Sequence, residues 1–260
     1  MTFLRTKIRS KSFRSIFILL VLLDLITGFI AFPELRQFSK PLILVSLIFF
    51  FLVKGRHLPR KIYRYTLVAL CFSLMGDILL LYDHISSLYF MLGLIAFLIA
   101  HISYSIVFLR QGKIIFKRKL LPVTGLLMAY GITLFIILHN NLGSLKFPVI
   151  IYILGILLLA ITAYSRKGRV NHLSFKLVFI GSLFFILSDS TLAINKFMMV
   201  IPGSHVLVMS TYAMAQYLMV RGILASNDRI YKRDFCKRHL SSKTCGNVAK
   251  NAHSLYHPSE

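Results

Sequence analysis

The sequence predicts an all-α, polytopic membrane protein with eight transmembrane helices and both termini on the cytoplasmic side. Three observations support this prediction. Hydrophobic residues make up 57% of the chain, and the mean hydropathy is +0.75, well above that of a soluble domain. The apolar residues come in long runs. Lysine and arginine gather in alternate connections between these runs.

The apolar runs define the helices in chain order. A transmembrane helix needs about 20 mostly apolar residues to cross roughly 30 Å of hydrocarbon. We predict eight spans, which cover residues 16–32, 41–53, 62–82, 88–109, 120–138, 147–164, 175–200 and 204–224. The second run is too short to cross unaided, so this helix must tilt or borrow flanking residues.

The distribution of basic residues sets the orientation. They lie in the amino-terminal tail, in the second, fourth and sixth connections and in the carboxy-terminal tail: Arg5, Lys7, Arg9, Lys11 and Arg14; Lys54, Arg56, Arg60 and Lys61; Arg110, Lys113, Lys117, Arg118 and Lys119; Arg166, Lys167 and Arg169; and Arg229, Lys232, Arg233, Lys237, Arg238, Lys243 and Lys250. The opposite connections hold only Arg36, Lys40 and Lys146. Cytoplasmic loops carry the excess of lysine and arginine, so both termini are expected in the cytoplasm.

The chain therefore divides into a basic amino-terminal tail (1–15), a transmembrane domain (16–224) and a basic carboxy-terminal tail (225–260), which we expect to be flexible. The net charge of +23 is spread over these tails and several connections. That spread favours attraction to anionic lipid headgroups at the cytoplasmic face, and it argues against a nucleic-acid partner.

Two aspartates lie inside apolar runs, Asp77 after Gly76 and Asp189 after Ser188. The chain has only eight acidic residues. A charged side chain at the centre of a bilayer costs about 2.5–3.5 kcal/mol on insertion scales and usually marks a functional site. A polar contact between helices is the plainer alternative. We expect Asp77 and Asp189 to be catalytic.

The third and seventh spans resemble each other. Asp77 follows Arg64 by thirteen residues, and Asp189 follows Lys176 by thirteen. Pro41 and Pro148 begin the second and sixth spans, and Ala100-His101 is echoed by Ala215-Gln216. These matches suggest a parallel repeat of four helices plus four, which would bring the two aspartates together across its axis.

A rise of about 1.5 Å per residue places other polar side chains relative to the aspartates. Tyr212 falls at a similar depth. Asn195, Lys196 and Lys40 fall nearer the outer surface, where the lysines are expected either to bind a phosphate or to extend to the interface.

A second polar layer is predicted nearer the cytoplasm. It contains Asp24, His101 and Gln216. Each of these side chains could equally serve helix packing. With Lys40, Asn195, Lys196 and Tyr212, we take His101 and Gln216 as candidate substrate-binding residues.

Several short motifs lie between residues 38 and 222: Lys40-Pro41-Leu42; Gly76-Asp77; Phe90-x-x-Gly93-x-x-x-Phe97-x-x-Ala100-His101-x-x-Tyr104; Pro148 with Tyr152; Ser188-Asp189-Ser190 followed by Leu192-Ala193-Ile194-Asn195-Lys196-Phe197; and Tyr212-x-x-Ala215-Gln216. Together they resemble the YhhN family of lysoplasmalogenase-like membrane proteins. The resemblance implies eight transmembrane helices and hydrolysis of the vinyl ether bond of lysoplasmalogens. The products would be a fatty aldehyde and glycerophosphoethanolamine or glycerophosphocholine.

Two carboxyl groups suit that chemistry. Vinyl ether hydrolysis needs a proton on the carbon β to the oxygen, followed by attack of water on the resulting oxocarbenium ion. Glycosidases divide similar work between two carboxyl groups, one protonated and one ionised. No Gly-x-Ser-x-Gly or His-Glu-x-x-His motif is present, and we expect no metal and no cofactor.

Other functions fit the same residues. A proton-coupled transporter would also have repeated helices with buried carboxylates. Asp77, Asp189 and His101 could instead hold a divalent metal that activates water. A lipid-binding protein without turnover is a further alternative. The membrane is expected to be a bacterial inner membrane, or the endoplasmic reticulum in a eukaryotic cell.

Overall fold

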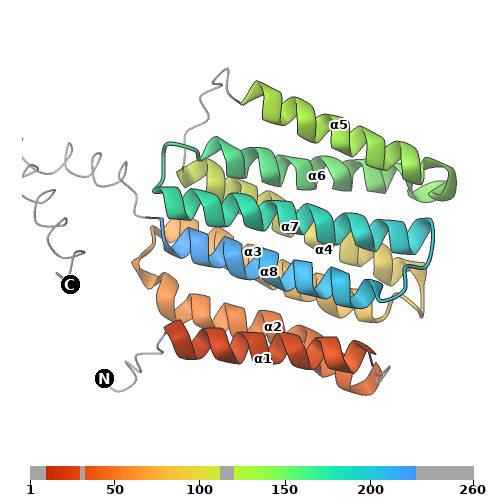
Figure 1. The fold of residues 1–260 in the computed structure, drawn as a ribbon, viewed down its shortest axis with the longest axis horizontal. Coiled ribbons are helices and arrows are strands. Elements are labelled where there is room, and N and C mark those ends of the chain that lie inside the picture. The colour runs from red at the N-terminus through yellow and green to blue at the C-terminus, as the bar shows by residue number, and fades with distance from the viewer. Residues whose placement is uncertain (1–9, 30–32, 112–119, 227–260) are drawn as a thin grey trace, which may run out of the picture.

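The computed structural model describes residues 10–29, 33–111 and 120–226, and these residues form an all-helical bundle (Figure 1). The eight α-helices are α1 (Ser10–Phe29), α2 (Pro33–Lys54), α3 (Arg60–Leu81), α4 (Ser87–Gln111), α5 (Leu121–Leu138), α6 (Lys146–Ser165), α7 (His172–Phe197) and α8 (Ser204–Leu224). Three short 3-10 helices, Gly55–His57, His139–Asn141 and Gly143–Leu145, lie in the connections. The all-α prediction is confirmed.

The first two helices differ most from the predicted spans. α1 begins at Ser10 rather than at residue 16, and residues 30–32 of that span lie outside the described residues. α2 has 22 residues rather than the 13 of the predicted run 41–53, because the helix continues through polar residues that a count of apolar residues leaves out. Pro41 and Lys40 therefore lie inside the helix and not at its start. Most of the two predicted tails, residues 1–9 and 227–260, lies outside the described part of the chain.

The helices pack side by side in an order that differs from their order in the chain. α1 and α2 lie at one edge of the bundle in Figure 1 and α5 and α6 at the other, with the remaining helices between them. The two most extensive contacts join α3 to α4 and α7 to α8, and α4 also packs along α6. The start of α1 and the end of α8 lie at the same end of the bundle.

Among the described residues, six helical segments are long and apolar enough to cross a membrane: Leu35–His57, Arg60–Leu81, Ser87–Gln111, Leu121–Asn141, Gly143–Ser165 and His172–Phe197. They identify the chain as an integral membrane protein. α1 and α8 are not among the six, so the count of eight crossings stays a prediction.

The contact between α7 and α8 depends on a small residue. A Cβ atom on Gly222 would lie 2.6 Å from Val178 Cγ2 and 3.0 Å from the backbone nitrogen of Val178. Membrane helices commonly use small residues in this way, because glycine lets two backbones approach closely.

We expect Gly222→Ala to destabilise the protein by about 1–3 kcal/mol, because a backbone atom cannot yield to the added methyl group. A lower midpoint of thermal unfolding in detergent would show this. Gly125→Ala is the matched control, since a Cβ atom at Gly125 on α5 would meet nothing within 4 Å. Equal midpoints for the two variants would contradict the close α7–α8 contact.

Candidate active site

Asp77 on α3 is buried and held by two neighbouring helices. Lys40 on α2 places its Nζ 3.6 Å from Asp77 Oδ1, and Tyr212 on α8 donates a hydrogen bond of 2.8 Å to Asp77 Oδ2. Lys40 is itself only 6% exposed. The negative charge that Asp77 brings into the bundle is therefore compensated by a buried cation and a hydroxyl donor.

A chain of hydrogen bonds extends from Tyr212. Gln216, one turn further along α8, donates weakly to the Tyr212 hydroxyl at 3.4 Å and more closely to Ser73 Oγ at 2.9 Å. The hydroxyl of Tyr104 on α4 donates to Gln216 Oε1 at 2.8 Å. All of these side chains are buried, so the chain connects α3, α4 and α8 through satisfied polar groups.

Asp189 on α7 has different partners. Tyr152 on α6 donates a hydrogen bond of 2.5 Å to Asp189 Oδ2, and His101 Nε2 on α4 lies 3.7 Å from the same oxygen. The imidazole of His101 is fully buried, and neither ring nitrogen has a hydrogen-bond partner. Within the described residues, no lysine or arginine forms an ion pair with Asp189.

The helices around the two carboxyl groups correspond, although the contacting side chains differ. Asp77 on α3 is contacted from α2 and α8, whereas Asp189 on α7 is contacted from α6 and α4. They do not contact each other directly. The ring of Phe185 packs edge-on against both Tyr212 and His101 and so lies between the two clusters.

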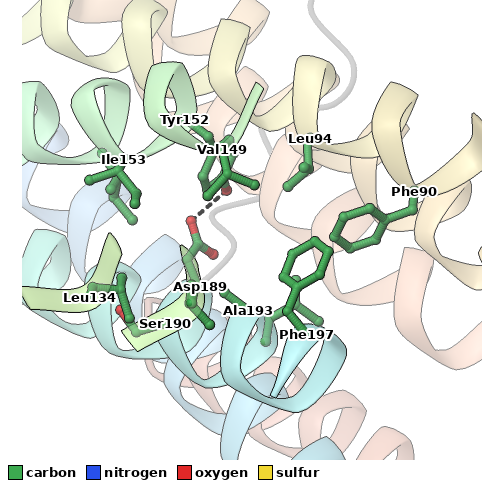
Figure 2. A pocket seen from close by; sticks show the side chains of 13 residues that line it. Phe90, Leu94, Leu134, Val149, Tyr152, Ile153, Asp189, Ser190, Ala193 and Phe197 are labelled. Atoms are coloured by element: carbon green, nitrogen blue, oxygen red, sulfur yellow. Dashed lines mark hydrogen bonds between the residues drawn. The ribbon is translucent and has the colours of Figure 1, made fainter. Parts of the chain in front are cut away.

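Asp189 lies at the wall of an apolar pocket (Figure 2). The pocket has about 480 Å³ of empty space, counting the part open to the surroundings, and is formed by α4, α5, α6 and α7. Its polar lining residues are Tyr152, Asp189 and Ser190; the others are Phe90, Leu94, Leu134, Leu138, Val149, Ile153, Ile156, Leu192, Ala193 and Phe197. Asp77 does not line it, so the two predicted catalytic residues do not share this pocket.

Three of the predicted site residues have different neighbours from those expected. Lys40 contacts Asp77 inside the bundle instead of lying at the outer surface. His101 and Gln216, predicted one layer away from the aspartates, reach Asp189 and Tyr212. The predicted depths were those of backbone positions alone. The side chains of His101 and Gln216 extend along the bundle from their backbone positions toward the layer of the aspartates.

Asp24 also lies elsewhere than expected, because α1 begins six residues before the predicted span. It accepts a hydrogen bond of 2.7 Å from Ser39 and lies 3.4 Å from His205 Nε2, at the end of the bundle where Lys40 is found.

Asn195 and Lys196 lie near the end of α7. Asn195 Oδ1 accepts a hydrogen bond from the backbone of Ile201 and so stabilises the connection to α8. Lys196 forms a partly exposed ion pair with Asp83 at 2.7 Å, and its Nζ lies 5.1 Å from the ring centroid of Phe90. Phe90 lines the pocket but Lys196 does not, so Lys196 is connected to the pocket through this ring.

Two tyrosines of this region were not predicted as site residues. Tyr152 donates to Asp189, and Tyr130 on α5 donates a 2.7 Å hydrogen bond to Ser190. The pairing of Tyr152 with Pro148 in the sequence motifs was a usable signal for the first. Nothing in the sequence distinguishes Tyr130.

The metal alternative required Asp77, Asp189 and His101 to converge. In residues 10–29, 33–111 and 120–226, no group of three or more histidine, cysteine, aspartate or glutamate side chains is placed to hold a metal ion.

Comparison with known proteins identifies relatives. A model of the YhhN family matches residues 35–223. The chain is 32% identical over 168 residues to human "Lysoplasmalogenase TMEM86A" and 30% identical over 168 residues to its cattle counterpart. Each alignment covers 63% of this chain and 66% of the relative, so it spans just under two thirds of these relatives' length. No solved structure matches the chain.

The ion pair of Lys40 with Asp77 gives a stability prediction. Lys40→Met leaves Asp77 without its cation, and breaking a buried ion pair from one side costs about 3–5 kcal/mol. We expect a clear fall in the thermal unfolding midpoint, and a partial recovery in Lys40→Met/Asp77→Asn, which buries neither charge. Lys176→Met, at an exposed lysine on α7, is the control. A Lys40→Met protein as stable as this control would refute the ion pair.

Proposed function

Because the chain belongs to the YhhN family, we propose that it is a lysoplasmalogenase-like membrane hydrolase. It would cleave the vinyl ether bond of a lysoplasmalogen to give a fatty aldehyde and glycerophosphoethanolamine or glycerophosphocholine. The observation that carries this proposal is the position of Asp189, a carboxyl group without a lysine or arginine partner among the described residues, at the wall of an apolar pocket. The printed names of the mammalian relatives support the same reaction.

The pocket suits a lipid with a single chain. Its apolar lining from four helices would surround the alkenyl chain, and its few polar groups gather around Asp189. A vinyl ether joins an apolar chain to a polar glycerol, so it would lie where these two kinds of lining meet. Lys196, next to Phe90, would then exchange its ion pair with Asp83 for the phosphate, and Asn195 would hold the adjoining connection in place.

Asp189 would supply the proton. An ionised carboxylate in apolar surroundings is costly unless a cation accompanies it, so the protonated acid is the favoured resting form of Asp189. Tyr152 holds one carboxyl oxygen through its hydrogen bond. The proton goes to the chain carbon β to the ether oxygen, the carbon–carbon double bond becomes a single bond, and an oxocarbenium ion forms.

Water completes the reaction. It adds to the cationic carbon, and its proton returns to the carboxylate of Asp189, so the acid is regenerated. The hemiacetal then transfers its hydroxyl proton to the ether oxygen as the carbon–oxygen bond breaks, releasing the aldehyde and glycerophosphoethanolamine or glycerophosphocholine. His101 Nε2, which lies 3.7 Å from Asp189 Oδ2 and has no hydrogen-bond partner, would orient that water.

We assign Asp77 the role of the ionised carboxylate. Lys40 and Tyr212 stabilise its negative charge, with Gln216 holding Tyr212. That charge would stabilise the oxocarbenium ion across Phe185 without contacting it. In this arrangement Lys40, Tyr212 and Gln216 serve the substrate indirectly.

The membrane arrangement belongs to the same proposal. We propose eight crossings with both termini in the cytoplasm, in a bacterial inner membrane or an endoplasmic reticulum, and basic connections against anionic headgroups. A parallel repeat of four plus four helices is supported by equivalent contacts: α3–α4 matches α7–α8, α1–α2 matches α5–α6, and the two aspartates have equivalent neighbouring helices.

Asp189→Asn should abolish release of fatty aldehyde from 1-alkenyl lysophosphatidylethanolamine by the purified protein. Asp77→Asn should lower the rate less, because Asp77 acts at a distance. The thermal unfolding midpoint and elution volume of each variant would show that it is folded. Near wild-type turnover by Asp189→Asn would exclude it as the acid, whereas no aldehyde from a folded wild-type protein would favour transport or lipid binding.

Tyr152→Phe should reduce the turnover rate by about tenfold or more, since the carboxyl group loses the donor that orients it. Tyr164→Phe is the matched control on the same helix, because its ring packs among Phe175 and Phe179 away from the pocket. Equal turnover rates for the two variants would show that the Tyr152 hydroxyl does not position Asp189.

A further inference from the structure

α5 is the least integrated of the candidate membrane spans. Only 17% of its most apolar segment is buried inside the structure, against 33–61% for the other five. It nevertheless closes one side of the Asp189 pocket with Leu134 and Leu138. On this side, the pocket is therefore separated from the surrounding lipid by α5, which has few buried residues, and by its contact with α6.

A second hollow lies on the lipid-facing side of this contact. It has about 510 Å³ of empty space, also counting its open part, and it lies between α5 and α6. All its lining residues are apolar: Met128, Gly131, Ile132, Phe135, Ile150, Ile153, Leu154 and Leu157. Ile153 lines both this groove and the Asp189 pocket, so the two spaces adjoin at this side chain.

The seam between α5 and α6 is closed by the ends of side chains. A Cβ atom on Gly131 would lie 2.6 Å from Leu157 Cδ1 and 3.1 Å from Ile153 Cγ2. The atoms nearest to this position are methyl groups rather than backbone. The seam can therefore open when these side chains change rotamer and α5 moves slightly away.

One hydrogen bond fastens α5 to the catalytic helix. The hydroxyl of Tyr130 donates to Ser190 Oγ at 2.7 Å, and Ser190 follows Asp189 directly and lines the pocket. Moving α5 outward would break this bond and widen the space beside Asp189. The glycerol hydroxyl of a lysolipid could then take the place of Tyr130 on Ser190.

We infer that the groove between α5 and α6 binds the alkyl chain of the lysolipid in the bilayer, and that the chain enters the Asp189 pocket through the seam at Gly131. This inference rests on the proposed function for the identity of the lipid. The alkyl chain is the occupant that fits, because the groove is wholly apolar, faces lipid and adjoins, at Ile153, a pocket whose polar groups lie around Asp189.

A reversible disulfide across the seam tests the inference. Gly131→Cys/Ile153→Cys would be made with the three native cysteines, Cys71, Cys236 and Cys245, replaced by serine. A Cβ atom on Gly131 would lie 3.1 Å from Ile153 Cγ2, which is bonded to the Cβ atom of Ile153. The two new Cβ atoms are therefore close to the Cβ–Cβ separation of a disulfide, about 3.5–4.5 Å. The probe is 1-alkyl lysophosphatidylethanolamine with a photoreactive group on its chain, which resists hydrolysis. After illumination, the amount of label on peptides that contain the residues lining the pocket measures how much probe has entered it.

We expect oxidation to slow labelling of the pocket by about tenfold or more, and reduction to restore it. Each single-cysteine variant should respond to neither treatment. Equal labelling of the oxidised and reduced protein would show that the alkyl chain does not enter through the seam at Gly131. Labelling needs no cleavage, so gated labelling without aldehyde release would overturn the hydrolase proposal alone.

Tyr130→Phe provides a second test that needs no new cysteines. Loss of the bond to Ser190 should raise the labelling rate severalfold, while Tyr164→Phe should leave it unchanged. An unchanged rate in Tyr130→Phe would show that this hydrogen bond does not hold the entrance closed.

Discussion

The rest of the site depends on how the bundle accommodates two buried carboxyl groups. An apolar helix bundle offers no solvent to stabilise a charge, so each carboxyl group must be neutralised, hydrogen-bonded or protonated. Asp77 has a buried lysine and a tyrosine hydroxyl. Asp189 accepts a hydrogen bond from a tyrosine hydroxyl and lies 3.7 Å from His101 Nε2. An apolar pocket lies on its open side. The same residue type is thus placed in two electrostatically different surroundings.

In the proposed mechanism, this difference divides the work between the two halves of the bundle. The half with Lys40 would keep an ionised carboxylate buried away from the pocket, and the half with Asp189 would keep a transferable proton beside it. In glycosidases the two carboxyl groups differ in the same way, one protonated and one ionised, around a cation of similar structure. If the proposed repeat of four plus four helices holds, α3 and α7 occupy equivalent positions, and one helical unit would provide both roles. Lys40 and Tyr152 are the side chains that make the halves unlike.

The sequence was sufficient for the helical class, and it singles out the two aspartates as candidates because charge within an apolar run is visible without any knowledge of packing. The helix ends were less accessible. Residues 10–15 and 33–40 are mostly polar, yet they belong to α1 and α2, and hydropathy alone cannot show this. To predict which side chains contact Lys40, one would have to know the register of α2 against α3. Tyr152 and Tyr130 are two of twelve tyrosines, and only the packing of α5, α6 and α7 distinguishes them from residues of the general core.

The central claim is that Asp189 delivers a proton to the chain carbon from within the pocket. Its most direct test is hydrolysis of the vinyl ether substrate in deuterated water, followed by reduction of the aldehyde and analysis of the carbon next to the former carbonyl. Delivery by a fixed acid predicts one deuterium at that carbon, in a single configuration. An aldehyde without deuterium, or with deuterium in both configurations equally, would show that the proton does not come from a positioned side chain.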